Sequence, residues 1–402
     1  MRPGVRWDCV SGPGRQVPSE AMPEKRYLMT PGPTPVPPQV LAAMAEPMIH
    51  HRAADFRSHY GGCLERLKQV CRTESDVLLF TTSGTGAFES AVVNLCAPGE
   101  RVVAVTAGSF GDRWVKLAQA FGADVVPLKY AWGETPQPAD LKAKLAEIGG
   151  APVAFVVQSE TSTGVVSDVQ SFAKVAREAG TTLVVDAVSS LAAVPLEMDA
   201  WGVDVVVSGS QKALMTPPGL GLAAVSQRAL EQAKGVKQPR FYFDWEKTRA
   251  AQAKVDAPFT PAVSLVIGMN VALGLILEEG LENAFARHVK LGRACRAGVK
   301  AMGLELFSPD EDRSAVVTAV KSPGGLDSGE LVKVLRDRYG VTIAGGQGDL
   351  KGKIFRIGHI GWFDLFDITT ALTATEIALV ELGADVARGA AVSAAVAAYQ
   401  AA

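Results

Sequence analysis

The sequence predicts an α/β protein with a mostly parallel sheet, followed by a smaller α+β domain. Its 402 residues are 48% hydrophobic, which is enough to build a large core, and the length suggests two domains. From about residue 75, short apolar runs without alternating polarity are separated by amphipathic stretches. Such runs are typical of strands buried on both faces, and the stretches between them are typical of crossover helices.

We expect four parts along the chain. Residues 1–26 are rich in proline, glycine and charge and lack periodicity, which indicates a loosely ordered tail. Residues 27–278 form the expected large domain, which begins with an extended, proline-rich arm. Residues 279–385 form the expected smaller C-terminal α+β domain. Residues 386–402 are an Ala-rich tail to which we assign no role.

Apolar runs and amphipathic stretches give the expected elements in order. The strands of the large domain are expected at residues 77–80, 101–105, 123–127, 153–158, 182–186 and 203–208. An apolar and then amphipathic segment at 263–302 predicts one or two connecting helices. In the second domain we expect strands at 315–320, 341–344 and 354–357, and helices at 328–339 and 368–382.

Charge and cysteine patterns argue against several classes of function. The net charge is −2 with charged residues spread along the chain, so no basic face for nucleic acid or an anionic membrane is visible. The five cysteines are scattered and never form C-x-x-C, which argues against a disulfide framework or a metal site. The N-terminus lacks the apolar region of a secretory signal, and the longest apolar run is shorter than the roughly 20 residues that span a bilayer. We therefore expect a cytoplasmic protein.

Residues 81–87 form a loop that could hold a phosphate. The sequence Thr-Thr-Ser-Gly-Thr-Gly-Ala follows one expected strand and precedes an amphipathic stretch. Backbone amides at such a helix start bind anions. The loop lacks the Gly-Lys-Ser/Thr ending of a Walker A motif and the third glycine of a dinucleotide fingerprint. Taken alone, it is as readily an ordinary tight turn.

A carboxylate and a lysine follow two further strands. Asp186 ends the run at 182–186, at the sheet edge where open α/β sheets bind ligands, although for this residue taken alone a helix-capping or salt-bridged aspartate is the favoured interpretation. Lys212 follows the next run and a Ser-Gly-Ser turn, although most lysines are solvated surface groups. In a crevice, desolvation and nearby positive charge would lower the pKa of its amine and make it a nucleophile toward an aldehyde. The order of loop, Asp186 and Lys212 on one predicted edge favours a shared site.

Four motifs together resemble those of the class V aminotransferases. They are Ser-Gly-Thr-Gly-Ala at 83–87, Glu-Thr-Ser-Thr-Gly at 160–164, Asp-Ala-Val-Ser-Ser at 186–190 and Ser-Gly-Ser-Gln-Lys-Ala-Leu at 208–214. The likeness runs from about Tyr27 to Leu382 and is strongest to the alanine–glyoxylate and serine–glyoxylate enzymes. It implies fold type I with a seven-stranded sheet, the cofactor pyridoxal 5'-phosphate, and a homodimer with shared active sites. The implied reaction moves an amino group from alanine or serine to a 2-oxo acid such as glyoxylate.

The resemblance also implies a role for each site residue. Lys212 would carry the cofactor as a Schiff base and act as the proton-transferring base, and Asp186 would keep the ring nitrogen protonated. Further cofactor contacts would come from Thr85, Gly86, Ala87, Phe110, Thr161, Val188, Gln211 and, from the neighbouring subunit, Thr260. The substrate would be held by Gly32 and by Arg356, whose planar guanidinium suits a carboxylate.

Several alternatives stay open. Another class V aminotransferase would use phosphoserine, aspartate or ureidoglycine as its donor. A cysteine desulfurase-like lyase would need a nucleophilic cysteine and usually a histidine before the lysine, where this chain has Gln211. A non-catalytic module fused to a DNA-binding domain would need more than 26 irregular residues at the start. Donor choice depends on side chains near the entrance, for which the candidates are His50, Arg52, Trp132 and Tyr242.

Overall fold

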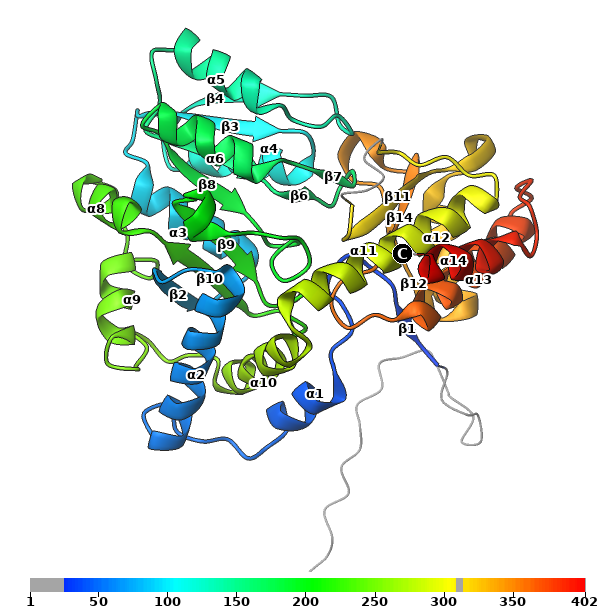
Figure 1. Cartoon of the computed structure of the whole chain (residues 1–402), viewed down its shortest axis with the longest axis horizontal. Coiled ribbons are helices and arrows are strands. Elements are labelled where there is room, and N and C mark those ends of the chain that lie inside the picture. Colours follow the sequence, from blue (N-terminus) through cyan, green and yellow to red (C-terminus); the bar gives the residue numbers. More distant parts are fainter. Residues whose placement is uncertain (1–24, 309–313, 402) are drawn as a thin grey trace, which may run out of the picture.

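The computed structural model describes residues 25–308 and 314–401, which form a larger unit and a smaller one packed side by side (Figure 1). The expected tail at residues 1–26 lies outside the described residues except for its last two positions.

A seven-stranded sheet forms the centre of the larger unit. Strand β10 pairs antiparallel with β2 and β9, and the other neighbours are parallel. This confirms the predicted α/β fold with a mostly parallel sheet. In spatial order the strands are β2 (Asp76–Thr81), β10 (Leu220–Val225), β9 (Val205–Gly209), β8 (Thr182–Asp186), β5 (Val153–Val157), β3 (Arg101–Thr106) and β4 (Asp124–Lys129).

The sequence prediction misses β10, the one strand that runs against the others. Its sequence, Leu-Gly-Leu-Ala-Ala-Val, is poor in the branched and aromatic residues that favour strands. The small residues have a structural reason, because a Cβ atom at Gly221 would lie 2.9 Å from the carbonyl oxygen of Ser83. A larger residue there would push away the loop that follows β2.

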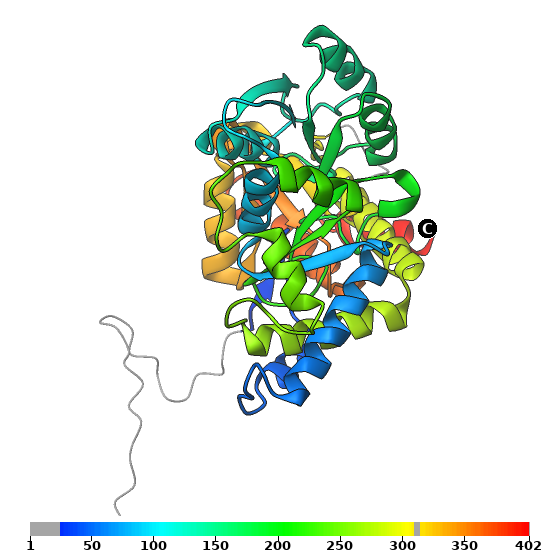
Figure 2. The same ribbon diagram turned by 90° about the vertical axis from the view of Figure 1, so that its left-hand side faces the viewer.

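Helices cover both faces of the sheet, which makes a three-layer structure (Figures 1 and 2). Alternate strand residues point to opposite faces: Val77 and Leu79 join one core cluster, and Leu78 and Phe80 join the other. This explains the continuous apolar runs. The first face carries α2 (Ala54–Cys71), α5 (Pro138–Glu147), α6 (Val169–Glu178) and α10 (Val263–Glu279). The second carries α3 (Gly84–Leu95), α4 (Ser109–Ala120), α8 (Gln227–Gly235) and α9 (Trp245–Gln252).

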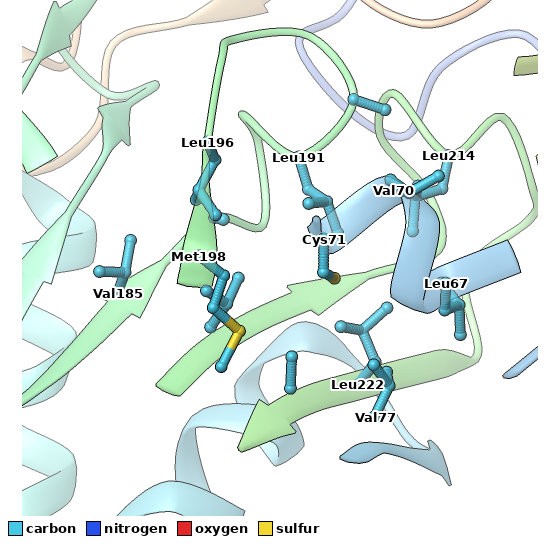
Figure 3. Packing of buried hydrophobic residues seen from close by; sticks show 14 of the residues in the cluster. Leu67, Val70, Cys71, Val77, Val185, Leu191, Leu196, Met198, Leu214 and Leu222 are labelled. Atoms are coloured by element: carbon cyan, nitrogen blue, oxygen red, sulfur yellow. The ribbon is translucent and has the colours of Figure 1, made fainter. Parts of the chain in front are cut away.

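Apolar packing fixes the helices on the sheet. Figure 3 shows Leu67, Val70 and Cys71 of α2 beside Val77 and Leu222, which come from β2 and β10. On the opposite face, the ring of Trp114 stacks on Phe88 at 4.1 Å and on Phe155 at 4.5 Å between centroids. Burial of one such apolar side chain stabilises the fold by about 1.5–3 kcal/mol. The strand ends that carry the candidate site are therefore anchored from both sides.

A three-stranded antiparallel sheet with helices packed on it forms the smaller unit. Its strands, in the order β11-β14-β13, are β11 (Val317–Lys321), β14 (Ile354–Gly358) and β13 (Ala344–Gly345). Its helices are α11 (Leu281–Ala301), α12 (Ser328–Tyr339), α13 (Leu365–Glu381) and α14 (Ala390–Gln400). Residues 386–402, expected as an Ala-rich tail, thus include a helix that packs on α11 and α13. Its small residues allow close approach, since Ala391 and Ala395 are fully buried.

The N-terminal arm connects the two units. Strand β1 (Tyr27–Leu28) pairs in parallel with β12 (Val341–Thr342), and the arm then leads to α1 (Pro38–Met44). The remaining elements are β6 (Ser159–Glu160), β7 (Val165–Val166), α7 (Met198–Trp201) and two 3-10 turns at Pro323–Gly325 and Gly348–Leu350. Among the described residues no single helix has the length and hydropathy to cross a membrane. Helices α10 and α11 together are long and apolar enough, but the pair is bent by 86°.

Candidate active site

The carboxyl ends of β2, β9 and β8 bring the predicted loop, Lys212 and Asp186 to one edge of the sheet. A Cβ atom at Gly209, the last residue of β9, would lie 3.3 Å from the backbone of Gly84 in the loop. A Cβ atom at Gly84 would in turn lie 2.9 Å from a methyl group of Val188, just after Asp186. The three segments are therefore in direct contact, as their order in the sequence predicts.

Lys212 is buried at this edge, with 8% of its surface exposed. Its Nζ donates a hydrogen bond of 2.7 Å to the carbonyl oxygen of Pro31. Burial lowers the pKa of the amine to about 8, and the charges of Arg356 and Arg113 lower it as well, while Asp186 opposes them. A lysine with this pKa has a substantial neutral fraction near neutral pH, so it can act as a nucleophile or base.

Gly32 gives the lysine amine its space. A Cβ atom at this position would lie 2.3 Å from Nζ of Lys212, and the backbone φ of 134° disfavours any other residue. The next residues hold the main chain of the lysine, because Oγ1 of Thr34 donates a 3.0 Å hydrogen bond to the carbonyl oxygen of Lys212. The arm thus touches the lysine at both its amine and its backbone.

Asp186 is a buried carboxylate beside the lysine. Its Oδ1 accepts a 2.8 Å hydrogen bond from the amide of Val188. Burial raises the pKa of Asp186 to about 7, and the nearby Glu160 raises it further, while Arg113 and Lys212 oppose the shift. A carboxylate in this setting is stabilised by a cationic group placed next to it.

The loop before α3 offers hydrogen-bond donors to an anion. Thr85 and Gly86 lie in the first turn of α3, where backbone amides point out of the end of the helix, and the amide of Gly86 donates a 2.9 Å hydrogen bond to the carbonyl oxygen of Ser83. The turn is tight, since a Cβ atom at Gly86 would lie 1.9 Å from Oγ1 of Thr82. Gln211, whose side chain reaches back toward Gly209, has a buried Oε1 without a hydrogen-bond partner. An orphaned buried amide oxygen indicates a ligand or solvent donor, and the Nε2 group of the same side chain carries the donors that a phosphate accepts, so these residues fit a phosphate-bearing aldehyde.

The two residues that were predicted to pack on a ring lie on α4 and just after β8. Phe110, in the first turn of α4, and Val188 are both half-buried. Thr161 is buried in the tight turn between β6 and β7, and its carbonyl oxygen accepts a 2.7 Å hydrogen bond from Nη1 of Arg356. Ala87 is fully buried against the sheet. Its side chain is therefore part of the core.

Arg356 reaches the site from β14 of the smaller unit. Its other hydrogen bonds go from Nε and Nη2 to the carbonyl oxygen of Gly345, at 3.0 and 2.7 Å. Among the described residues no carboxylate forms an ion pair with it. Burial lowers the pKa of the guanidinium to about 10, and Glu160 opposes this shift. A buried cation held only by carbonyl groups suits a carboxylate ligand.

Two charged residues at this edge were not predicted from the sequence. Glu160 is buried and accepts hydrogen bonds from the amides of Phe110 and Gly111 at 3.0 and 3.1 Å, and from the amide and hydroxyl of Ser162. Arg113 donates a 2.8 Å hydrogen bond to Oγ1 of Thr85. The only signal for Glu160 was its place in the motif at 160–164, and Arg113 had none.

The structure places the remaining predicted residues on the surface or against other groups. Thr260 is exposed and shares a small surface pocket with Thr81 and Tyr242. His50 and Arg52 are exposed before α2, and Trp132 packs against Gly348 of the smaller unit. Among the described residues no group of three or more His, Cys, Asp or Glu side chains is placed to hold a metal ion.

Comparisons with known proteins agree on one family. The profile of the family described as aminotransferase class-V matches residues 26–350. A relative from Anabaena cylindrica, named soluble hydrogenase 42 kDa subunit, is 42% identical over 365 residues, which are 90% of this chain and 95% of that protein. The serine–glyoxylate aminotransferase of Methylorubrum extorquens is 37% identical over 384 residues, covering 93% of this chain and 96% of that protein.

A solved structure extends the likeness to three dimensions. The crystal structure of alanine–glyoxylate aminotransferase from Nostoc sp. matches with a TM-score of 0.85 and 31% identity, covering 91% of this chain and 98% of that chain. Its agreement with the profile match and with the relatives shows both the fold and the family. The chain belongs to the class V aminotransferases, a family of pyridoxal-phosphate enzymes with fold type I.

Proposed function

We propose that this chain is a transaminase that moves an amino group from alanine or serine to glyoxylate. The observation that carries the proposal is the arrangement of three buried charged groups: the amine of Lys212, the carboxylate of Asp186 and the guanidinium of Arg356. Coulomb interactions join Lys212 to the other two. This arrangement supplies a nucleophile, a counter-charge and a carboxylate receptor close to one another.

We assign the cofactor contacts to the residues at the sheet edge. Pyridoxal phosphate, when bound, supplies a ring that accepts electrons during amino transfer. Lys212 is its covalent tether, and Asp186 is the charge partner of the ring nitrogen. Phe110 and Val188 hold the two ring faces, and Thr161 lies near the ring hydroxyl. The phosphate contacts are assigned to the loop amides of Thr85, Gly86 and Ala87 with the hydroxyl of Thr85, and to the side chain of Gln211.

Lys212 is also the proposed base. Its pKa of about 8 is close to neutral pH. Nζ can therefore both accept a proton from the donor's α-carbon and release it again. Because the amine is almost fully buried, the proton that it carries is shielded from bulk water. Asp186 stays ionised beside a cationic ring, because opposite charges at short range favour the charged forms of both groups.

Arg356 is the proposed receptor for the substrate carboxylate. Its guanidinium is already oriented by the carbonyl oxygens of Thr161 and Gly345, so little side-chain freedom is lost when a substrate binds. Gly32 lies beside the amine of Lys212, where a side chain would compete with the amine and with a donor bound to it. Both features support a short amino acid with one carboxylate.

We infer that the active form is a homodimer with shared sites. Thr260 lies on an exposed segment next to an uncovered aromatic cluster, in which Phe259 stacks on Tyr242 at 5.1 Å and Phe241 is 73% exposed. A second copy covering this cluster would bring its Thr260 to the phosphate of the first. Size determination in solution, with Thr260→Ala and cofactor retention as a second readout, tests this assignment; a monomer with full activity would contradict it.

The acceptor and donor are argued from the relatives. Glyoxylate appears in the names of both the serine–glyoxylate and the alanine–glyoxylate aminotransferase, so it is the proposed acceptor. The donors in those names differ, and aspartate, phosphoserine or ureidoglycine are the competing donors. Among the described residues the cysteines do not favour a desulfurase reaction, because burial raises the pKa of each thiol; they are Cys63, Cys71, Cys96 and Cys295, and Cys9 lies outside the described residues.

A donor panel tests the proposal. Purified enzyme is given each of alanine, serine, aspartate, phosphoserine, ureidoglycine and cysteine with glyoxylate or pyruvate, and the amino and oxo acid products are quantified. We expect glycine from glyoxylate with alanine or serine, and none from Lys212→Ala. A preference for another donor would correct the substrate, sulfide release from cysteine would favour a lyase, and no turnover with any donor would overturn the transaminase assignment.

A further inference from the structure

A cation with no assigned role stands at the proposed phosphate loop. Arg113 lies in α4, and its Nη1 donates a 2.8 Å hydrogen bond to Oγ1 of Thr85. Its guanidinium also lies 4.8 Å from the ring centroid of Phe110. The side chain is half-buried. Arg113 therefore touches both a residue proposed for the phosphate and the residue proposed for the ring.

The guanidinium is without a carboxylate partner among the described residues. Its hydrogen bond to Thr85 uses one of five N–H donors, so the others are available. A partly buried guanidinium has lost some of its water, and its planar fork fits an anion with several acceptor oxygens. Arg113 thus has the charge and the free donors that a phosphate requires.

The contact with Thr85 also prepares the hydroxyl of that residue. A hydroxyl group can accept hydrogen bonds and donate one. Because Oγ1 accepts from Arg113, its own proton is left to donate to a ligand. The loop amides add only partial positive charge, and Lys212 serves the aldehyde end of the cofactor. A full positive charge for the phosphate must come from elsewhere.

We propose that Arg113 is a phosphate-binding residue for pyridoxal phosphate, which pairs with the phosphate and orients the Thr85 hydroxyl. This inference rests on the proposed role of the Thr85 loop. The competing role is packing on the cofactor ring through Phe110, which would not depend on the phosphate.

Equilibrium binding to the full-length apoenzyme separates the two roles. Pyridoxal phosphate and pyridoxal share the ring and the aldehyde and differ only in the phosphate. We expect Arg113→Gln to raise the Kd of pyridoxal phosphate by about tenfold or more, and to change the Kd of pyridoxal by less than about twofold. Lys116→Gln, which removes an exposed charge from the same helix, is the matched control and changes neither.

Each outcome decides between the roles. Equal losses for both ligands would assign Arg113 to ring packing, and no loss for either would leave it without a cofactor role; both overturn the proposal. If Arg113→Gln does not fold, Arg113→Lys carries the test, because it keeps the charge and loses the planar fork. The ratio of the Kd of pyridoxal to the Kd of pyridoxal phosphate should then fall, but by less than is expected for Arg113→Gln. An unchanged ratio in that variant would also overturn the proposal.

Thr85→Val tests the underlying site separately. This variant keeps the shape of Thr85 and removes its hydroxyl. If it leaves the ratio of the two Kd values unchanged while Arg113→Gln also leaves it unchanged, the proposed phosphate loop is wrong. A changed ratio in Thr85→Val with an unchanged ratio in Arg113→Gln removes only the role of Arg113.

Discussion

The amine of Lys212 donates a hydrogen bond of 2.7 Å to the carbonyl oxygen of Pro31, although 181 positions separate the two residues. The same arm holds the backbone beside the lysine, because the amide of Thr34 donates a 3.2 Å hydrogen bond to the carbonyl oxygen of Gln211. The position of the reactive amine thus depends on a segment outside the sheet that carries the lysine.

Gly32→Ala is expected to displace the amine of Lys212. The added Cβ atom would lie 2.3 Å from Nζ, which is far inside van der Waals contact. We expect loss of bound cofactor, measured by visible absorbance, and a fall in transaminase activity of about 100-fold or more, as for misplacement of a reacting group by about 1 Å.

Gly99→Ala is the matched control for this substitution. Gly99 also has a positive φ, of 77°, but no other group lies within 4 Å of the position that a Cβ atom would take there. Both variants add a Cβ atom at a positive φ, which costs about 1–2 kcal/mol at Gly99 and about 1–3 kcal/mol at Gly32, and only Gly32→Ala meets the lysine. Equal activity in the two variants would show that the contact with Nζ is unimportant.

The amine of Lys212 should become reactive at a lower pH than an ordinary lysine. Burial lowers its pKa to about 8, and only the neutral amine is nucleophilic. Reductive methylation of the apoenzyme, followed by mass spectrometry, should give a rate that rises with a midpoint near pH 8, against about 10.4 for free acetyl-lysine. In Asp186→Asn the midpoint should fall further, because the carboxylate raises the pKa of the amine. A midpoint near 10 would contradict the buried geometry.

Asp186→Asn should stabilise the apoenzyme at alkaline pH while it impairs catalysis. The pKa of Asp186 is raised to about 7 in the fold from 3.8, so the folded state binds a proton more tightly than the unfolded state. The wild type therefore loses stability as pH rises from about 4 to 7, and the variant, which has no such proton, does not. Urea unfolding should show an advantage of about 1 kcal/mol or more for the variant at pH 8, which disappears below pH 4.

Activity gives the second half of this prediction. If Asp186 is the charge partner of the cofactor ring, Asp186→Asn should lower kcat by about 100-fold or more in the same preparations. A variant that is more stable and fully active would remove Asp186 from the catalytic site. A variant that is less stable at every pH would contradict the raised pKa instead.

Arg356→Lys should weaken the use of substrates that carry a carboxylate. The two-pronged contact is lost, and we expect kcat/KM for alanine or serine to fall by about 30-fold or more. Simple amines without a carboxylate should be affected far less. Arg338→Lys is the control, because this exposed arginine pairs with Glu381 at 3.0 Å and contributes little. Equal losses for both classes of amine would argue for a structural role of Arg356.

Much of the fold follows from local pattern. The apolar runs located six strands, of which all but the edge strand β4 are buried on both faces. Helix α12 was expected at its observed bounds, and the structure shows that Asp327 caps it and Gly340 ends it. Strand β10 was missed because it is rich in small residues, and Gly221 among them is needed to leave space for the loop that follows β2. Helix α14 was missed because alanine gives no amphipathic pattern, and only its partners α11 and α13 reveal the buried side.

The sequence predicted those parts of the candidate site in which a reactive residue stands at the end of an expected strand. Asp186 and Lys212 each follow a buried strand, so sheet geometry alone brings them to one edge. Glu160 and Arg113 depend on contacts across the fold, with Phe110 in one case and Thr85 in the other, so the motif at 160–164 marked Glu160 without giving its role, and no pattern marked Arg113. The contact between Arg356 and Thr161 joins the two units and likewise needs their packing.

The pairing of β1 with β12 has a consequence for biosynthesis. Tyr27 lies opposite Val341, so β1 is synthesised more than three hundred residues before the strand with which it pairs. Until that partner emerges, the arm has an open edge and Lys212 lacks its anchored contact with Pro31. A nascent chain can therefore complete the pocket only after Thr342 has left the ribosome, and cofactor capture reports on that stage of synthesis.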